Sequence, residues 1–472
     1  MLGWRRQVAS LNPLAVGGGA YRSVMCRAGA LKLWGCITAI SLAVLVSGCG
    51  VPSDSFEVVS TPGPDPLPTV ENTSPALRPA EVGTTQLAAG LVGPGDLTYR
   101  GAFRLPGEDA EHGWAWGGSA LTYSATGVPE GRIDGLPGSL FGTGHDHHQW
   151  VGEVSIPAPS PGRQLDDLPR ASTLQLFTDI RGGLFDFSFF EMPRVAIEYL
   201  DGRLFFAWGR HLELDTPEYT HGWATPALGS ERPRGPWRVD GVSPYAVGDY
   251  LFAVDPVWGE AHLGGGSHLA TGRFRDGGWG GMGPSLHAYR VPPDAAPYTA
   301  LPSVALIQYH SSEGAGAASL HGYHHSDEWT GGAWLRPGDS SAVVIIGTKG
   351  IGDCWYGFEN GVVWPEGGPH PPVPPPPFDT RGWWSSRFEA QILFYDPSDL
   401  AAVAAGRLAP YEPQPFAVLP IEDVLLAERR PSMKGRTGGV AYDPGNGYLF
   451  VLEPFADGER PVVHVWSVPP AG

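Results

Sequence analysis

The chain has 472 residues, of which 67 are glycine and 48 are proline, and aromatic residues make up 11%. So many turn-forming residues exclude a coiled coil, a helical bundle and a collagen-like rod, while the aromatic content excludes a disordered chain, which lacks large apolar groups to bury. The formal net charge is −18 without any basic run. This argues against nucleic-acid binding, because neutralising phosphates requires clustered lysine and arginine. We therefore expect an all-β globular protein with many tight turns.

The N-terminal region carries the pattern of an export signal. Residues 37–46 form an apolar run behind Arg27 and Lys32. The run is shorter than the roughly 20 residues that a membrane-spanning helix needs, and it fits the core of a signal peptide. It ends in Val-Ser-Gly-Cys49, which resembles the lipobox of bacterial lipoproteins. This resemblance implies cleavage before Cys49 and a lipid on its side chain, with Met25 as an alternative start of the chain.

The sequence thus predicts three parts. Residues 1–48 are expected to be a lipoprotein signal peptide, and residues 49–85 the lipidated Cys49 with a tether rich in proline, serine and threonine. Residues 86–472 are expected to fold. The anchor places the protein in the bacterial cell envelope, facing outside the cytoplasm and tied to a membrane by its lipid. We expect a monomer. Cys354 is the one cysteine beyond the first 50 residues, which excludes a disulfide framework and a CxxC zinc site.

From about residue 96, short apolar runs alternate with turns in a repeating pattern. Three copies show a strand that a glycine pair opens, a strongly apolar strand and an alternating strand, and a fourth apolar stretch follows two of them. These copies start at Gly117, Gly331 and Gly438, and two weaker ones start at Val195 and Tyr250. Repeated four-stranded units with inserted loops are typical of a β-propeller, and the count predicts five blades. A β-sandwich is the alternative, but it would not need three glycine-pair openings.

The last copy lacks a fourth strand, whereas residues 97–105 read as a strand that stands alone before the first copy. We expect this strand to complete the last blade and close the ring, which removes exposed sheet edges. Two further segments are predicted. Residues 396–406, with Asp396 as cap and Gly406 as stop, form a short connecting helix. Residues 365–378 form a polyproline-like surface loop.

The glycine-pair opening Gly-Gly-x-Ala-x-x-Tyr (117–123), the GTGHD turn (142–146) and the closing GGVAYDP…VHVWSV (438–468) together carry a resemblance. They are similar to an uncharacterised family of secreted bacterial β-propeller proteins. The resemblance covers most of residues 96–470. It implies the fold and no activity.

In a propeller, the loops from the second to the third strand and from one blade to the next share one face. The richest of these predicted loops is 144–150, Gly-His-Asp-His-His-Gln-Trp. Several histidines and tryptophans map to this face. The candidate ligand-binding residues are His145, His148, Trp150, Arg210, His211, His324, His325, Lys349, Trp355 and Arg436.

Three functions remain open from the sequence. The leading hypothesis is binding of a glycan or another cell-envelope ligand, since aromatic faces stack on sugar rings while carboxylates and histidines hold hydroxyls. The second is a glycoside hydrolase or polysaccharide lyase, for which two carboxylates are needed. Its candidate catalytic residues are Asp146, Glu453 and Asp353, with Asp327 and Glu328 as further carboxylates. The third is a metal-dependent enzyme that holds a divalent ion by His145, His148, His324 and His325.

Overall fold

The computed structural model describes residues 90–107, 112–126, 135–188, 194–211, 218–275, 279–312 and 318–468. Contacts divide the chain into Met1–Val70 and Glu71–Gly472, and every described residue lies in the second unit. The predicted signal peptide, the tether and Cys49 therefore lie outside the described residues. Within the described ranges, no helix has the length and apolar character that crossing a membrane requires.

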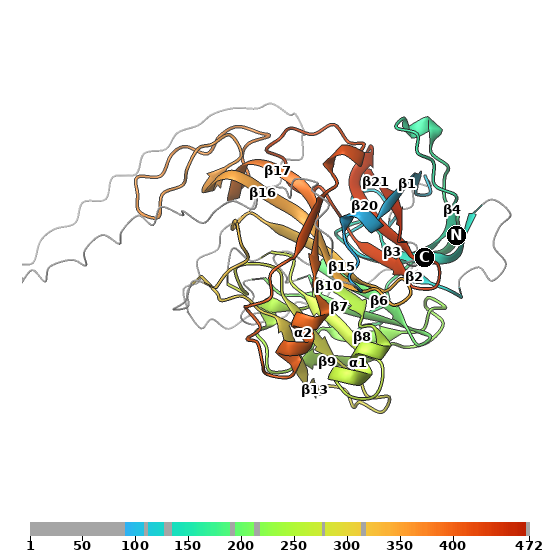
Figure 1. Cartoon of the computed structure of the whole chain (residues 1–472). Helices are drawn as coiled ribbons and strands as arrows, with labels where there is room; N and C mark the ends of the chain where they lie inside the picture. Colours follow the sequence, from blue (N-terminus) through green and yellow to red (C-terminus); the bar gives the residue numbers. More distant parts are fainter. Residues whose placement is uncertain are drawn as a thin grey trace, which may run out of the picture. The chain divides into compact units, whose positions relative to one another are not determined.

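The second unit is built from five antiparallel sheets, which are the predicted blades (Figure 1). Blade 1 contains β2 (Leu121–Ser124), β3 (Gly135–Thr143), β4 (Val151–Pro157) and β5 (Thr173–Thr178). Blade 2 contains β6 (Arg194–Leu200), β7 (Arg203–Gly209), β8 (His221–Ala224) and β9 (Arg234–Val239), and the short β13 (Ala300–Leu301) pairs parallel to β9. Blade 3 contains β10 (Tyr250–Ala253), β11 (Leu269–Gly272), β12 (Leu286–Tyr289) and β14 (Ser303–Ile307).

Blade 4 contains β15 (Glu328–Leu335), β16 (Ala342–Phe358), β17 (Arg381–Tyr395) and β18 (Ala417–Pro420). Blade 5 contains β19 (Val440–Asp443), β20 (Tyr448–Asp457), β21 (Arg460–Ser467) and β1 (Thr98–Arg104). The first strands of the five blades, β2, β6, β10, β15 and β19, contact one another in a closed ring, with β19 against β2. A closed ring of five sheets is a five-bladed propeller, so the predicted fold is confirmed and the sandwich is excluded.

The ring is closed by the N-terminal strand, as the sequence predicts. β1 pairs with β21 in antiparallel register, from Thr98 opposite Ser467 to Arg104 opposite Val462. The apolar side chains of Ala102 and Phe103 are fully buried between the sheets. The fourth strand of blade 5 thus comes from the opposite end of the folded chain.

A tight turn and a predicted helix follow directly from the local sequence. Asp201 and Gly202 both adopt positive φ, 51° and 73°, in the tight turn between β6 and β7. The predicted connecting helix is α2 (Pro397–Ala404), whose first turn is capped by Asp396 accepting from the Ser398 amide at 2.7 Å. The sequence analysis missed α1 (Pro256–His262), although an Asp-Pro pair starts it in the same way: Asp255 accepts from the Trp258 amide at 2.8 Å.

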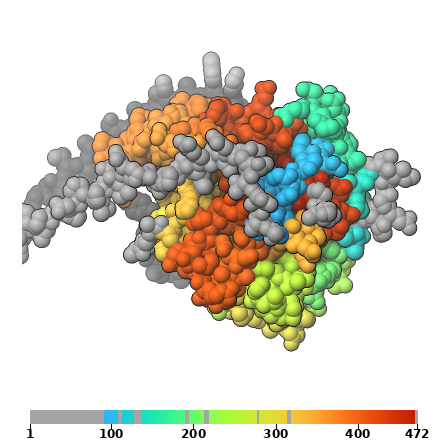
Figure 2. Space-filling model, in the orientation of Figure 1, coloured from blue at the N-terminus to red at the C-terminus, as the bar shows by residue number. Residues whose placement is uncertain are grey.

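Blade 4 departs from the predicted pattern. The candidates Lys349, Asp353 and Trp355 lie in β16 and not in a loop, because β16 pairs with β17 from Val343–Tyr395 to Phe358–Arg381. The added length forms a two-stranded arm, residues 350–358 and 381–387, which stands out from the blades at the upper left of Figures 1 and 2. The predicted polyproline-like segment 365–378 contains no helix or strand and lies in the loop between these two strands.

We predict that the closing strand contributes a large part of the stability. Phe103→Ala removes a fully buried ring from the core that β1 shares with the rest of blade 5 and with blade 1. Substitutions of this kind cost about 3–5 kcal/mol. Urea unfolding of the purified protein measures the change. The control is Val304→Ala on β14, the matching outer strand of blade 3, whose side chain is 38% exposed. An equal effect of both substitutions would show that β1 adds little to the fold.

Candidate functional site

One face of the propeller carries the five loops that join second to third strands. The segments that lead into the five inner strands lie at the same face, which we call the loop face. The loops are those between β3 and β4, β7 and β8, β11 and β12, β16 and β17, and β20 and β21. Antiparallel pairing within each blade brings these connections to the same ends of the sheets. The candidate residues of the loop face form two groups.

The first group is at the boundary of blades 5 and 1. Trp116 and Phe455 pack edge to face with their ring centroids 5.1 Å apart, and their side chains remain 48% and 45% exposed. Both have φ of 58°, in the left-handed region that side-chain-bearing residues rarely adopt. Such backbone strain is retained where the surrounding structure or function requires it. The carbonyl of Trp116 accepts from the amide of Asp146 at 3.1 Å, which joins this pair to the predicted loop 144–150.

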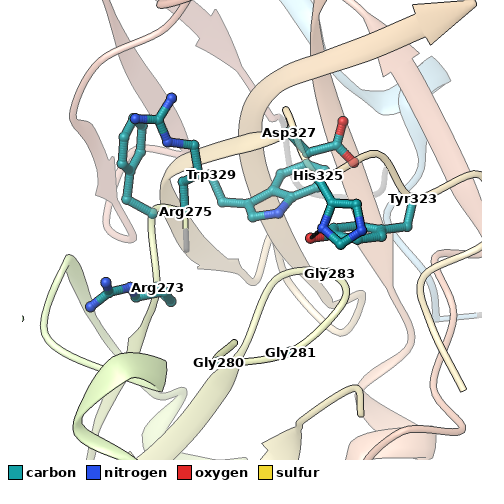
Figure 3. Close-up of a pocket in the computed structure, with 10 residues that line it drawn as sticks. Arg273, Arg275, Gly280, Gly281, Gly283, Tyr323, His325, Asp327 and Trp329 are labelled. Carbon is teal, nitrogen blue, oxygen red and sulfur yellow. Dashed lines mark hydrogen bonds between the residues drawn. The ribbon is translucent and has the colours of Figure 1, made fainter. Parts of the chain in front are cut away.

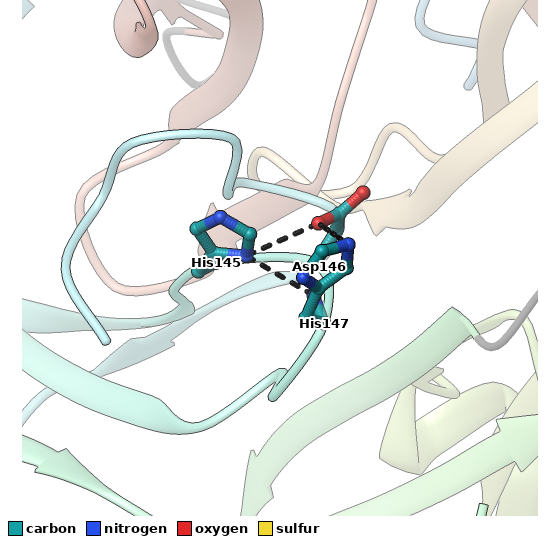
Figure 4. Close-up of side chains that lie close together, drawn as sticks. All are labelled: His145, Asp146 and His147. Carbon is teal, nitrogen blue, oxygen red and sulfur yellow. Dashed lines mark hydrogen bonds and ion pairs between the residues drawn. The ribbon is translucent and has the colours of Figure 1, made fainter. Parts of the chain in front are cut away.

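Loop 144–150 brings the side chains of His145, Asp146 and His147 close together (Figure 4). His145 Nδ1 lies 3.1 Å from Asp146 Oδ1 and accepts from the amide of His147 at 3.2 Å. The side chain of Asp146 is 61% exposed, and His147 is also largely exposed. We call Trp116, His145, Asp146, His147 and Phe455 the rim cluster. Among the predicted site residues, it contains His145 and Asp146.

The other two candidate ligand-binding residues of this loop, His148 and Trp150, pack against His112. Trp150 stacks on His112 with centroids 3.7 Å apart, and His148 packs edge-on against His112 at 4.5 Å. Trp150 and His148 are partly buried, so these rings fix the position of the loop as well as contributing to its surface.

The second group lies where inner strands begin. Asp249 directly precedes β10 and Glu328 opens β15, and these two strands are neighbours in the ring. Arg273 Nε lies 3.3 Å from Asp249 Oδ2, which also accepts from the amide of Phe274 at 2.8 Å. Arg275 Nη1 donates to Glu328 Oε1 at 3.2 Å, while Glu328 Oε2 accepts from the amide of Gly435 at 2.9 Å. Both carboxylates are buried.

Two cations in this region face aromatic rings. Arg194 is partly buried, with its guanidinium 3.8 Å from the ring centre of Phe274. Lys434 Nζ lies 4.3 Å from the ring centre of Trp384. Burial, and next the charge of Arg275, lower the pKa of Lys434 to about 7, although Glu328 acts in the other direction. We call Asp249, Arg273, Arg275, Glu328 and Lys434 the central cluster.

A small pocket of about 10 Å³ opens beside the central cluster (Figure 3). Arg273 and Arg275 lie on one side of it, and Tyr323 packs against His325 on the other, with centroids 5.2 Å apart. His325 also stacks on Trp383 of the arm at 4.4 Å. The pocket has room for about one water molecule.

Lys349 and His324 are held by partners near this pocket. Lys349 Nζ donates to Asp327 Oδ1 at 3.0 Å and to the carbonyl of Gly350 at 2.8 Å. His324 Nδ1 is 2.8 Å from Ser385 Oγ, and burial, followed by the charge of Lys349, lowers the pKa of His324 to about 4. Asp327 is completely buried. These contacts hold the arm against the segment that leads into β15.

Arg436 is buried and ion-paired with Glu422, and it donates to three backbone carbonyls. His211 lies 3.0 Å from Arg273 Nη2, and burial, together with Arg273, lowers its pKa to about 4. Arg210 is buried at the end of β7. Trp355, on the arm, donates from Nε1 to the carbonyl of Phe358 at 3.0 Å.

The predicted catalytic carboxylates do not come together. Asp146 is exposed on the rim cluster, whereas Asp353 is exposed on the arm. Glu453 is fully buried in blade 5: its Oε2 lies 2.9 Å from His464 Nε2, and its two oxygens accept from the amides of Leu426 and Ala427. Burial raises the pKa of Glu453, but the hydrogen bond and charge of His464 outweigh this and hold it below its ordinary value. With both oxygens engaged inside the blade, Glu453 has a structural position.

The predicted metal ligands are also divided. In the described part of the chain, the residues with ligand atoms close enough to share an ion are His145, Asp146 and His147, within 4.8 Å of one another. His148, His324 and His325 are not in this group. Three neighbouring residues of one largely exposed loop offer only a weak metal site.

Sequence reasoning did not single out Asp249, Arg194 or Phe455. Asp249 had a recognisable signal, because it stands immediately before the first strand of its repeat, close to where Glu328 stands in another repeat. Phe455 had none, since its exposure depends on a turn conformation that the sequence does not reveal.

No protein-family model matches the chain, and no curated protein does. Solved structures give weak similarities. A member of the GH130 family of mannoside phosphorylases, a family that contains glycoside hydrolases targeting β-1,2 mannosidic linkages in Candida mannan, is 10% identical over 82% of this chain and 94% of that one, with a TM-score of 0.37. A protein of Bacteroides thetaiotaomicron that was provisionally named a glycosidase is 10% identical over 80% of this chain and 94% of that one, with a TM-score of 0.36. At these values neither carries an argument about function.

Lys434 supplies a pH prediction. The unfolded lysine has a pKa of 10.5 and the folded one about 7, so folding disfavours the charged form. This cost is fully present below pH 7 and disappears as the pH rises towards 10.5. Lys434→Met should therefore raise the free energy of unfolding at pH 6 and have a smaller effect at pH 9.5, as measured by urea unfolding.

The matched control is Lys349→Met, which removes a buried lysine that is paired with Asp327. This substitution leaves a buried carboxylate without its cation and should destabilise the protein at pH 6. A destabilising or pH-independent effect of Lys434→Met would contradict the assignment of a depressed pKa to this amine.

Proposed function

We propose that the loop face binds a glycan or another hydroxyl-rich ligand of the cell envelope, with the rim cluster as its first contact. The observation that supports this most directly is the Trp116–Phe455 pair, two large rings kept about half exposed in strained backbone. Exposing such rings costs the free energy of hydrating apolar surface. A ligand with an apolar ring face, such as a sugar, would cover them.

Polar groups at the same place suit this ligand. Asp146 and His147 are exposed in the loop whose backbone bonds to Trp116 through the amide of Asp146. A carboxylate accepts hydrogen bonds from hydroxyls, and an imidazole can donate or accept. The rim cluster thus combines a stacking surface with hydroxyl partners from a single loop.

Hydrolysis is the second candidate, and the central cluster favours it. Asp249 and Glu328 begin neighbouring inner strands, which brings two carboxylates to the middle of the loop face. A glycosidase needs such a pair. Both carboxylates are buried and ion-paired with arginine, however, so binding without cleavage is the function that the geometry supports better.

The lipobox adds a location to the proposal. We place the protein in the cell envelope of a bacterium, anchored through the lipid on Cys49 and facing outside the cytoplasm. Support comes from the apolar run and the Val-Ser-Gly-Cys sequence alone.

Trp116→Ala should weaken retention of the purified protein on the polysaccharide it binds by about tenfold, because a stacking surface is lost. A pull-down against plant, algal and bacterial polysaccharides, with reducing ends measured in parallel, provides the test. Tyr298→Ala is the control: Tyr298 is also an aromatic at positive φ, is 65% exposed and packs edge to face, on Tyr219, at the outer edge of blade 2. Equal retention of Trp116→Ala and the unaltered protein would remove the rim cluster from the site. If the unaltered protein releases reducing ends and the Glu328→Gln variant does not, the result would instead indicate hydrolysis.

The anchor has its own test. Cys49→Ser removes the thiol that would carry the lipid, so the protein should move from the membrane fraction to the soluble fraction of bacterial cells. Cys36→Ser in the same segment should leave the distribution unchanged. Membrane retention of the Cys49→Ser protein would show that the lipobox resemblance does not reflect lipidation.

A further inference from the structure

Lysine is rare in this chain. Of the 31 lysine and arginine residues, three are lysine, at positions 32, 349 and 434. Lys32 lies outside the described residues, and the other two lie in or near the central cluster. Arginine keeps its charge in proteins, whereas the amine of lysine can lose its proton and then becomes a nucleophile. Lys349 and Lys434 are therefore the places in the described chain where amine chemistry is available.

The amine of Lys434 is surrounded by aromatic rings. Its Nζ lies 4.3 Å from the ring centre of Trp384 and 5.9 Å from that of Phe388, and both rings belong to β17. It makes no hydrogen bond or ion pair with any residue that the structure describes. Lys349, in contrast, donates to Asp327 and to a backbone carbonyl. Of the two lysines, Lys434 is the one whose nitrogen is not committed to an acceptor.

The carboxylates that act on Lys434 are already engaged. Each oxygen of Glu328 accepts from another group, Oε1 from Arg275 and Oε2 from a backbone amide. Glu359 accepts two hydrogen bonds from Arg430, at 2.9 and 3.0 Å. No counter-ion among the described residues therefore holds the amine in its charged form.

The balance of the surrounding groups favours a neutral amine. Burial, followed by Arg275, lowers the pKa of Lys434 to about 7, while Glu328, Cys354 and Glu359 act in the opposite direction. About half of this amine is therefore neutral at pH 7, compared with less than about 0.1% of an ordinary lysine. The side chain remains partly exposed in the segment that leads into β19, so small solutes can reach it from the loop face.

We propose that Lys434 binds aldehydes covalently, as an imine formed at Nζ. The neutral amine attacks the carbonyl carbon, and a proton passes from the nitrogen to the oxygen to give a carbinolamine. Loss of one water molecule then leaves a carbon–nitrogen double bond, and no oxidant or reductant is consumed. A protonated imine is again a cation, so it keeps a favourable position over the ring of Trp384.

Two kinds of molecule carry the required group. One is a short free aldehyde, and the other is a reducing sugar in its open-chain form. The second source rests on the proposed binding of glycans at the loop face, whereas the first does not.

Reductive trapping provides the test. The purified protein is incubated at pH 7.5 with glycolaldehyde or with glucose, in the presence of cyanoborohydride, which reduces an imine to a stable secondary amine. Peptide masses then locate the adducts. We expect glycolaldehyde to label Lys434 at least about tenfold faster than Lys349, because the latter amine is charged and paired with Asp327. Lys434→Arg should remove the fast adduct.

A second pair of variants tests the cause of this reactivity. Arg275→Gln removes the neighbouring cation and releases Glu328 to pair with the amine, so labelling of Lys434 should slow by about tenfold. The matched control is Arg238→Gln in blade 2, where the arginine is ion-paired with Asp240 at 3.2 Å. This control should leave the rate unchanged.

Equal labelling of Lys434 and Lys349 would overturn the proposal, as would an unchanged rate in Arg275→Gln. Labelling of Lys434 by glycolaldehyde alone would support the imine and assign a short aldehyde. Labelling by glucose as well, again faster than at Lys349, would assign the open-chain sugar. Trapping without polysaccharide retention would contradict the proposed function alone, and retention without trapping would contradict the imine alone.

Discussion

The pairing of β1 with β21 is the constraint on which the rest of the structure depends. Without it, blade 5 would have three strands and β21 would be an open edge. With it, β19 is held against both β15 and β2, and the five inner strands form one ring. The loop face exists as a single surface because of this closure, since it consists of connections that the ring brings together from all parts of the chain.

Charge is distributed in an unusual way over this framework. The chain as a whole carries an excess of acidic groups, yet the entrance to the inner strands gathers Arg194, Arg273, Arg275 and Lys434. Asp249 and Glu328 neutralise part of this charge, and the rings of Phe274 and Trp384 face the remainder. Buried charges are stable only with such partners. The charged groups at the centre of the propeller are therefore held by internal contacts, whereas the rings of the rim cluster remain about half exposed.

The sequence predicts the fold better than the site, for physical reasons. The spacing of apolar residues in a strand and the glycine pairs that open strands are local features of the sequence. The five blades, the closing strand and α2 could therefore be predicted from the sequence alone. The arm could not, because Lys349 to Trp355 contains two glycines and a charge pair that are equally typical of a loop; only pairing with β17 makes it a strand. Glu453 shows the same limit at the site. A glutamate at the end of a predicted strand looks exposed, and its burial depends on His464, Leu426 and Ala427, which come from other parts of blade 5 and the preceding connection.

The chain enters the propeller at the face opposite the loop face. Gly90, the first described residue, accepts from the amide of Ser341 in the turn between β15 and β16, and that turn lies at the face opposite the loop face. β1 then runs from that face towards the loops. The described chain therefore begins at the face opposite the loop face, and Trp116 and Phe455 lie at the other end of the blades.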